Sequence, residues 1–349
     1  MSPELTIRIA DLLTQARFSK EPLVIERCSM GGNNRTYRVE TPDGVFAIKE
    51  YFTHSTDSRD RLHSEFAFLS FAANVVGAMV PKPYAHNPRD QIALYEFIEG
   101  WPIQENGVTE REVNAAIHFF RQLNAPELRK QAVTLPNASE ACFSIQEHFD
   151  LIAARIRQVQ QISPDTEERK TAQQYAEQLN HFWLDLVDQT KELAQNESFD
   201  LTFALPVEQR CLSPSDFGFH NALKTIDGQI FFIDFEYAGW DDPGKMVGDF
   251  FAQIAVPVPE KFFEPFIHKT MVLFPGPENL IRRARILRPA YQVKWCCIAL
   301  NVFLPHHLAR RKFANEHLDV VALQRSQLLK VERLMKLLKP LSMASEYGL

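Results

Sequence analysis

The chain has 349 residues, enough for two folded regions, because single hydrophobic cores tend to stop growing near about 250–300 residues. Hydrophobic residues make up 45% of it and charged residues 23%, values that are ordinary for a globular protein and exclude extensive disorder. The formal net charge of −6 argues against broad attraction to nucleic acid or to an anionic membrane, and it mildly suits a cationic substrate.

The sequence shows no secretory signal at its N-terminus and no run of about 18 consecutive apolar residues. Its five cysteines are scattered, without the paired spacing of a zinc site, so we expect free thiols in a reducing compartment. We therefore expect a cytoplasmic protein with no nucleic-acid partner and no membrane contact.

The first part of the chain predicts an antiparallel sheet. Strand-like runs alternate with turn residues from Leu23 to Tyr51, and the Pro-Asp-Gly sequence at 42–44 is typical of a hairpin turn. The next segment carries apolar residues at helical spacing, and we expect Pro81 to end this helix. Residues 1–98 are thus predicted to form a small sheet with one long helix.

The remainder of the chain, residues 99–349, is predicted to be mostly helical. Two helices over about 143–195 carry long apolar stripes that need a partner, and they are expected to pack together as a helical hairpin. Short strands and turns return over about 205–243, with Asp227-Gly228 marking a second hairpin turn. Helices are expected again from there to the end.

Two charged residues in the N-terminal part suggest an ion pair. Lys49 follows apolar residues on a predicted strand, and a lysine in such a position needs an anionic partner. Glu65 lies at the margin of the apolar face of the next helix, from which it can reach the sheet. The alternatives are a lysine that protects a strand edge and a glutamate exposed to solvent.

Three polar residues in the second strand-and-turn region suggest a metal site. Asp216 and Asn221 lie five residues apart in a loop that contains Gly218, and Asp234 follows the apolar run "IFFI". A buried carboxylate is costly unless it is paired or metal-bound, and carboxylate and amide oxygens are ligands that Mg²⁺ prefers. With Lys49, these groups meet the requirements for transfer of a phosphoryl group from a nucleoside triphosphate.

In this order the motifs resemble those of the aminoglycoside phosphotransferase and choline kinase family of small-molecule kinases. The resemblance rests on the D-x-x-x-x-N spacing from Asp216 to Asn221, on Asp234-Phe235, and on the upstream lysine and glutamate. It covers about residues 23 to 250. It implies an α+β, bilobal, protein-kinase-like fold, with a nucleotide-binding lobe at 1–98 and a larger, mostly helical lobe at 99–349.

The resemblance also implies roles for individual residues. Asp216 would be the catalytic base, Asn221 and Asp234 would bind Mg²⁺, and Lys49, held by Glu65, would contact the α and β phosphates of ATP or GTP. Further nucleotide contacts would come from the turn that covers the phosphates and from main-chain groups beside the purine, at Gly31, Gly32, Asn33, Asn34, Glu96, Phe97 and Ile98.

The acceptor is expected to be a small polar molecule with a hydroxyl group, resembling an aminoglycoside, choline or a sugar. An acidic and aromatic cluster borders the expected acceptor side, either binding the acceptor or capping turns, at Glu236, Trp240, Asp241 and Asp242.

Two departures from the family pattern keep a second hypothesis open. Pro214 replaces a histidine, and Glu236 replaces the glycine of the D-F-G motif. The alternative to an active kinase is therefore a catalytically impaired nucleotide-binding scaffold. Either protein would be a monomer or a homodimer.

Overall fold

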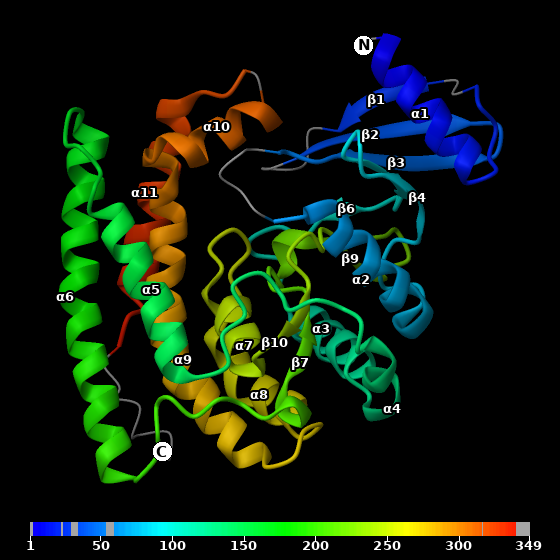
Figure 1. Cartoon of the computed structure of the whole chain (residues 1–349). Coiled ribbons are helices and arrows are strands. Elements are labelled where there is room, and N and C mark those ends of the chain that lie inside the picture. The colour runs from blue at the N-terminus through cyan, green and yellow to red at the C-terminus, as the bar shows by residue number, and fades with distance from the viewer. Residues whose placement is uncertain (1–2, 22–23, 29–33, 54–58, 316, 340–349) are drawn as a thin grey trace.

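Among the described residues, a five-stranded antiparallel sheet forms the N-terminal part of the chain, and helices form most of the remainder (Figure 1). The computed structural model describes residues 3–21, 24–28, 34–53, 59–315 and 317–339. This arrangement agrees with the predicted α+β fold, with a small antiparallel sheet and a larger, mostly helical part.

The N-terminal sheet has the strand order β1-β2-β3-β5-β4. Its strands are Val24–Cys28, Arg35–Thr41, Gly44–Glu50, Pro83–Asn87 and Ile92–Glu96, numbered β1 to β5 along the chain. Thr41 pairs with Gly44 across the hairpin between β2 and β3, so the predicted turn is confirmed. A helix that was not predicted from the sequence, α1 (Pro3–Gln15), packs against β4 and β5 and buries Leu5, Ile9 and Leu12.

Helix α2 (Arg61–Val76) comes after the first three strands and lies between the sheet and the helical part. Asp60 begins it by accepting a hydrogen bond from the backbone N–H of His63. It ends at Gly77, which has a positive φ of 57°, four residues before the proline that the sequence predicts as its end. Its buried face includes Glu65, which is 3% exposed.

The segment after β5 leads into the larger part of the molecule through β6 (Trp101–Pro102). That strand pairs with β8 (Ala222–Lys224), which pairs in turn with β9 (Ile230–Phe232). The turn between β8 and β9 closes with a hydrogen bond from Thr225 N to Gln229 O of 2.9 Å, as the Asp-Gly signal predicts. A second antiparallel pair consists of β7 (Cys211–Ser213) and β10 (Gly239–Asp241). In the chain, β7 comes before β8 and β10 comes after β9.

The helices of the larger part form two groups. Helices α5 and α6 occupy the segment in which the sequence predicts a helical hairpin, and they pack with α9 and α11 around a common apolar core (Figure 1). Helices α3, α7 and α8 share a second apolar core with α2, the short helix α4 follows α3, and α10 lies between α9 and α11 in the chain. In chain order from α3 the bounds are Glu110–Leu123, Pro126–Arg129, Ile145–Val159, Glu167–Asn196, Pro243–Ala252, Phe263–Met271, Pro277–Leu300, Pro305–Ala314 and Val320–Met335. No described helix is both long enough and apolar enough to cross a membrane.

A capping box begins α3 and connects this helix to β8. The Thr109 hydroxyl and N–H both donate to the Glu112 carboxylate, which also accepts from Lys224 Nζ at 2.9 Å. Burial alone would raise the pKa of Glu112, but the hydrogen bonds of Thr109 and Lys224 lower it to about 2. Glu112 therefore stabilises the fold as a carboxylate.

Glu112→Gln should reduce the acid sensitivity of the protein. Because the pKa of Glu112 in the folded protein lies below its ordinary value of 4.5, its stabilisation is complete above that value and is lost as the pH falls towards 2. Between about pH 6 and pH 3 the wild type should lose about 2 kcal/mol more free energy of unfolding than Glu112→Gln, measured by urea unfolding. Glu110→Gln, exposed on the same helix, should behave like the wild type. Equal pH dependence in Glu112→Gln and wild type would contradict this role.

Candidate active site

Lys49 lies at the centre of a partly buried ion-pair triad. Its Nζ is 2.6 Å from Glu65 Oε2 on α2 and 2.6 Å from Asp234 Oδ1, which comes after β9. Burial opposes protonation of Lys49, but the carboxylates of Asp234 and Glu65 raise its pKa well above the ordinary value. The ammonium group therefore stays charged, and it joins the sheet to the helical part.

Two tyrosines and a backbone N–H hold Glu65 in place. The Tyr51 hydroxyl donates to Glu65 Oε2 at 2.7 Å and lies 2.7 Å from the Tyr95 hydroxyl, while Phe235 N donates to Glu65 Oε1 at 3.1 Å. Tyr51 comes two residues after Lys49, so the alternation of the extended chain places it on the same face. Glu65 was predicted from the sequence and the tyrosines were not, although this alternation was a usable signal.

Asp216 lies in the loop after β7, where its carboxylate has two side-chain partners. His220 Nε2 is 3.2 Å from Asp216 Oδ1, and the Asn221 amide nitrogen donates to the Asp216 backbone oxygen at 3.0 Å and to Oδ2 at 3.3 Å. Burial would raise the pKa of Asp216, but the charge and hydrogen bond of His220 and the Asn221 amide lower it below the ordinary value. The carboxylate is therefore ionised and oriented.

Glycine at position 218 allows His220 to lie against the loop backbone. A Cβ atom at Gly218 would come within 2.7 Å of His220 Nδ1, closer than such contacts allow. The family pattern has a histidine where this chain has Pro214, and here His220, from the other end of the loop, contacts the Asp216 carboxylate instead. This contact orients the Asp216 carboxylate from within the loop.

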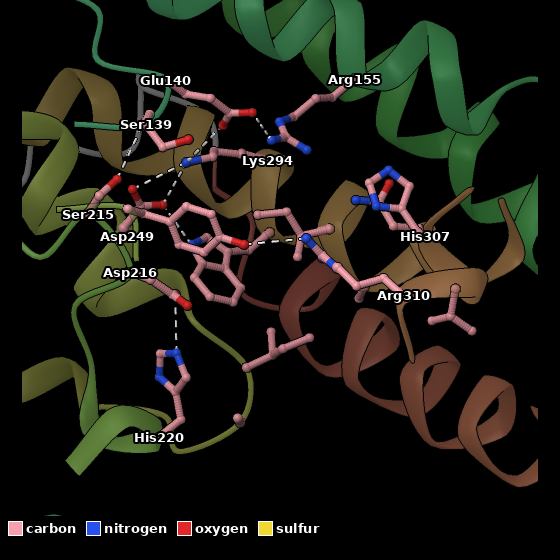
Figure 2. Close-up of a pocket in the computed structure, with 18 of the residues that line it drawn as sticks. Ser139, Glu140, Arg155, Ser215, Asp216, His220, Asp249, Lys294, His307 and Arg310 are labelled. Atoms are coloured by element: carbon pink, nitrogen blue, oxygen red, sulfur yellow. Dashed lines mark hydrogen bonds and ion pairs between the residues drawn. The ribbon is translucent and has the colours of Figure 1, made fainter. Parts of the chain in front are cut away.

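Asp216, Asn221 and Asp234 line a single cavity of about 830 Å³, and apart from Arg59 all the residues that line it belong to the larger part of the molecule. Figure 2 shows Asp216 and His220 on one side of this cavity and Arg310 and His307 on the other. Asp234 has a positive φ of 67°, an unusual backbone conformation for a residue other than glycine and one that is concentrated at functional sites. The structure thus brings these three residues together and places Lys49 against one of them.

The oxygen atoms in this group fit a divalent cation of the Mg²⁺ type. The Asn221 amide nitrogen is used by Asp216, which leaves Asn221 Oδ1 without a partner among the described residues. Lys49 uses Oδ1 of Asp234, and the other carboxylate oxygen also has no described partner. Both atoms belong to side chains that line the cavity, and both are hard ligands.

The predicted phosphate-covering turn is only partly described. Gly31, Gly32 and Asn33 lie outside the described residues. Asn34 is buried, and it accepts a hydrogen bond from Phe52 N at 3.1 Å and donates to Glu236 Oε2 at 2.6 Å. Its side chain therefore joins the start of β2 to the segment after Asp234.

The residues predicted beside the purine, Glu96, Phe97 and Ile98, lie where β5 leaves the sheet towards β6. Glu96 pairs with Phe46 on β3, and the Arg38 guanidinium lies over the Phe97 ring at 5.3 Å. They occupy the connection between the two parts of the molecule, and their contact with a purine stays a prediction.

The four residues predicted on the acceptor side have other partners, and none of them is among the residues that line the cavity. Glu236 is buried against Arg61 and Asn34, and Trp240 donates through Nε1 to Ala132 O at 3.0 Å. Asp241 and Asp242 are fully buried carboxylates that accept bonds from Lys245 and Arg283 respectively. These contacts hold the segment after Asp234 in place, and Asp242 also caps α7 by accepting from Gly244 N, while contact of the four residues with an acceptor stays a prediction.

Most of the charged residues that line the cavity were not predicted from the sequence. Basic side chains enter it from helices far along the chain, above all from α10, which contributes His307, Arg310 and Arg311. A signal was available, because these residues recur at positions i, i+3 and i+4 of a helix and so share one face.

Comparison with known proteins places the chain in a family. Residues 24–270 match the phosphotransferase enzyme family. The chain belongs to this family. Its membership confirms the predicted relationship and the predicted enzyme class, a phosphotransferase with an alcohol group as acceptor. No curated protein matches the sequence.

Solved structures of small-molecule kinases share the fold along almost the whole chain. A choline kinase from Streptococcus pneumoniae is 15% identical, with 95% of this chain and 98% of that chain covered and a TM-score of 0.56. An ethanolamine kinase from Plasmodium vivax is 15% identical, covering 88% and 81%, with a TM-score of 0.54. A spectinomycin phosphotransferase solved with ADP and spectinomycin is 13% identical, covering 92% and 97%, with a TM-score of 0.56. At these identities the likeness shows a shared fold.

Glu236→Gln should destabilise the phosphotransferase, because it removes the charge that Arg61 meets in the interior at 3.4 Å. Breaking one side of a buried ion pair typically costs about 3 kcal/mol or more, so the urea midpoint should fall. Glu192→Gln, on the exposed face of α6, serves as the control and should unfold at the wild-type midpoint. If both variants unfold alike, Glu236 does not hold these segments together.

Proposed function

We propose that this phosphotransferase is a Mg²⁺-dependent kinase that transfers the γ-phosphoryl group of ATP, or of GTP, to a hydroxyl group of a small polar metabolite. The observation that carries the proposal is the contact of 2.6 Å between Lys49 and Asp234, because Asp234 lines the same cavity as Asp216. A cation for the phosphates, oxygen ligands for a metal and a base thus meet at one place.

Asp216 would receive the proton of the acceptor hydroxyl. Its lowered pKa keeps it ionised at neutral pH, and the contacts of His220 and Asn221 hold its carboxylate in one orientation. A base held in this way needs no reorganisation when the hydroxyl attacks. The hydroxyl of Ser215, the residue before Asp216, accepts a hydrogen bond of 2.7 Å from Lys245 Nζ, which fixes this end of the loop.

Asn221 and Asp234 would hold the metal through their unpartnered oxygens, and Lys49 would turn from Asp234 to the α and β phosphates while it stays paired with Glu65. The bound Mg²⁺ would neutralise charge on the phosphates during transfer. Glu65 remains beside Lys49 through its bonds to Tyr51 and Phe235 N, so the lysine keeps its position as its partners change.

The geometry gives no support to the alternative of a catalytically impaired scaffold. That hypothesis rested on Pro214 and Glu236. His220 contacts the Asp216 carboxylate across the loop that Pro214 begins, and Glu236 forms buried contacts with Asn34 and Arg61. Neither departure displaces Asp216, Asn221 or Asp234 from the cavity.

The acceptor class is supported in outline by the structures that share the fold. They are a choline kinase, an ethanolamine kinase and a spectinomycin phosphotransferase, which are enzymes for small polar molecules. The five cysteines are free thiols in the structure, and four of them are buried, which supports a reducing compartment such as the cytoplasm.

Asp216→Asn should abolish turnover while leaving nucleotide binding intact, because it removes the base without removing a phosphate contact. ADP release from Mg²⁺-ATP over a panel of hydroxylated metabolites should fall by about 10²-fold or more. The affinity for Mg²⁺-ADP, measured by calorimetry, should change by less than about twofold. Asp188→Asn, exposed on α6, is the matched control. Unchanged turnover would remove Asp216 from the mechanism.

Asp234→Asn should make nucleotide binding insensitive to Mg²⁺. Asparagine tolerates the positive φ of this position, so the change removes charge with little strain on the backbone. In calorimetry, Mg²⁺ should strengthen ADP binding to the wild type by about tenfold and to Asp234→Asn by less than about twofold. If Mg²⁺ does not change the ADP affinity of the wild type, the proposal is wrong and a nucleotide-binding scaffold is favoured.

A further inference from the structure

The cavity beside Asp216 is lined by more positive than negative side chains. Of the described residues, six lysines and arginines face it, against the four carboxylates of Glu140, Asp216, Asp234 and Asp249. The basic residues are Arg59, Arg155, Lys294, Arg310, Arg311 and Lys330. This composition differs from the acidic, aromatic surface that the sequence predicts for the acceptor.

Two of the four carboxylates are already used by neighbouring cations. Glu140 pairs with Arg155, and Asp249 accepts from Lys294 Nζ at 3.0 Å and from Trp295 Nε1 at 2.8 Å. The remaining two, Asp216 and Asp234, belong to the catalytic loop and to the Lys49 triad. The described lining therefore holds no carboxylate left over for a positively charged acceptor.

Three of the cations, in contrast, form no ion pair with any described residue: Arg310, Arg311 and Lys330. Arg310 donates only to the Tyr237 hydroxyl, at 3.3 Å, and its Nε is buried without a hydrogen-bond partner among the described residues (Figure 2). A buried donor of this kind costs free energy until an acceptor reaches it.

These cations also repel one another. Burial and Arg310 lower the pKa of Arg311, and Tyr237 and Asp216 only partly offset this effect. Burial lowers the pKa of Lys330, with Glu105 acting in the opposite direction and Arg311 adding to the decrease. Burial, followed by Arg310, lowers the pKa of His307 to about 4. Positive charge thus accumulates on the part of the cavity wall that α10 and α11 supply.

Contacts with the N-terminal sheet hold α10 over the cavity. Arg27 Nη2 donates to Ala314 O at 2.7 Å and Arg35 Nε donates to Phe313 O at 3.2 Å, at the C-terminal end of the helix. The Arg35 guanidinium also lies over the Phe313 ring at 4.2 Å. Because α10 is fixed at this end, the face that carries Arg310 and Arg311 is presented to the cavity as a preformed surface.

We propose that the acceptor of this enzyme carries an anionic group, a phosphate ester or a carboxylate, which is bound by Arg310, Arg311 and Lys330 while its hydroxyl group faces Asp216. The inference rests on the proposed kinase function. A guanidinium group matches either anion with two parallel N–H donors, and the three cations would gain an anionic partner that no described residue supplies.

The same cations are poorly placed to serve the nucleotide. Lys49 and the predicted purine contacts lie on the sheet side, on β3 and after β5, whereas Lys330 lies on α11 in the helical part. Asp234 lines the cavity next to Lys49, whereas Arg310, Arg311 and Lys330 line it from α10 and α11. A phosphate chain held by Lys49 and Asp234 leaves the wall formed by α10 and α11 for the acceptor.

The first test compares acceptors that differ only in charge. ADP release from Mg²⁺-ATP would be measured with glycerol, glycerol phosphate and glycerate; with glucose, glucose phosphate, glucuronate and glucosamine; and with choline. We expect an anionic member to exceed its neutral and aminated counterparts by about tenfold or more in kcat/KM, and the phosphate and carboxylate arms identify the anion. Preference for choline or glucosamine would overturn the proposal.

The second test uses Arg311→Gln, with Lys312→Gln as its matched control. Lys312 is the next residue of α10, but it is exposed and does not line the cavity. For the best anionic acceptor, Arg311→Gln should raise the acceptor KM by about tenfold and the ATP KM by less than about twofold, while Lys312→Gln changes neither. A rise in the ATP KM alone would assign the cations to the nucleotide and overturn the proposal.

Direct binding decides the case if no member of the panel is phosphorylated. Inorganic phosphate would be titrated into protein saturated with Mg²⁺ and a non-hydrolysable ATP analogue, and stability measured by thermal unfolding. Phosphate should raise the Tm of wild type and of Lys312→Gln, but not of Arg311→Gln; equal shifts in all three would overturn the proposal. If the analogue fails to bind, the kinase function fails, and the same titration without nucleotide still tests the anion site.

Discussion

A buried lysine ammonium group must be surrounded by carboxylates, and the arrangement of this site results from that requirement. Lys49 comes from the sheet, Glu65 from α2 and Asp234 from the segment after β9, so the ion pairs hold three separate elements at one point. Desolvating any one of these charges alone would be costly, which makes the three positions interdependent. The ion pairs of Lys49 therefore join the sheet to the helical part, and they also fix a cation that a nucleotide phosphate would bind.

Other buried lysines near the catalytic loop are also paired with carboxylates. This pairing determines which carboxylates remain available for catalysis. Lys245 is fully buried, and it donates to Asp241 at 2.7 Å and to the Ser215 hydroxyl at 2.7 Å. Lys294 and Asp249 form a second buried pair nearby. Structural lysines thus neutralise most of the local carboxylates, while Asp216 and Asp234 stay on the cavity wall.

The parts of the site that were predictable from sequence are those with a local pattern. Strand alternation placed Lys49, the five-residue spacing placed Asp216 and Asn221 in one loop, and the Pro-Asp-Gly and Asp-Gly turns gave both hairpins. The end of α2 was wrong, because Gly77 stops the helix before any proline is reached. The partner of Asp241 could not be predicted from the sequence either. A run of acidic residues has the same sequence pattern whether it faces a ligand or buried lysines.

The charge of the cavity shows most clearly why the net charge of the whole sequence says little about the charge of a single site. A net charge of −6 suits a cationic substrate, yet a carboxylate acts on the cavity only if it lies close by and has no cation of its own. Glu140 and Asp249 lie close but are paired, whereas Arg310 and Arg311 lie close without a carboxylate partner among the described residues. The field at a site therefore depends on which charges remain uncompensated after folding, and only the three-dimensional pairing decides that.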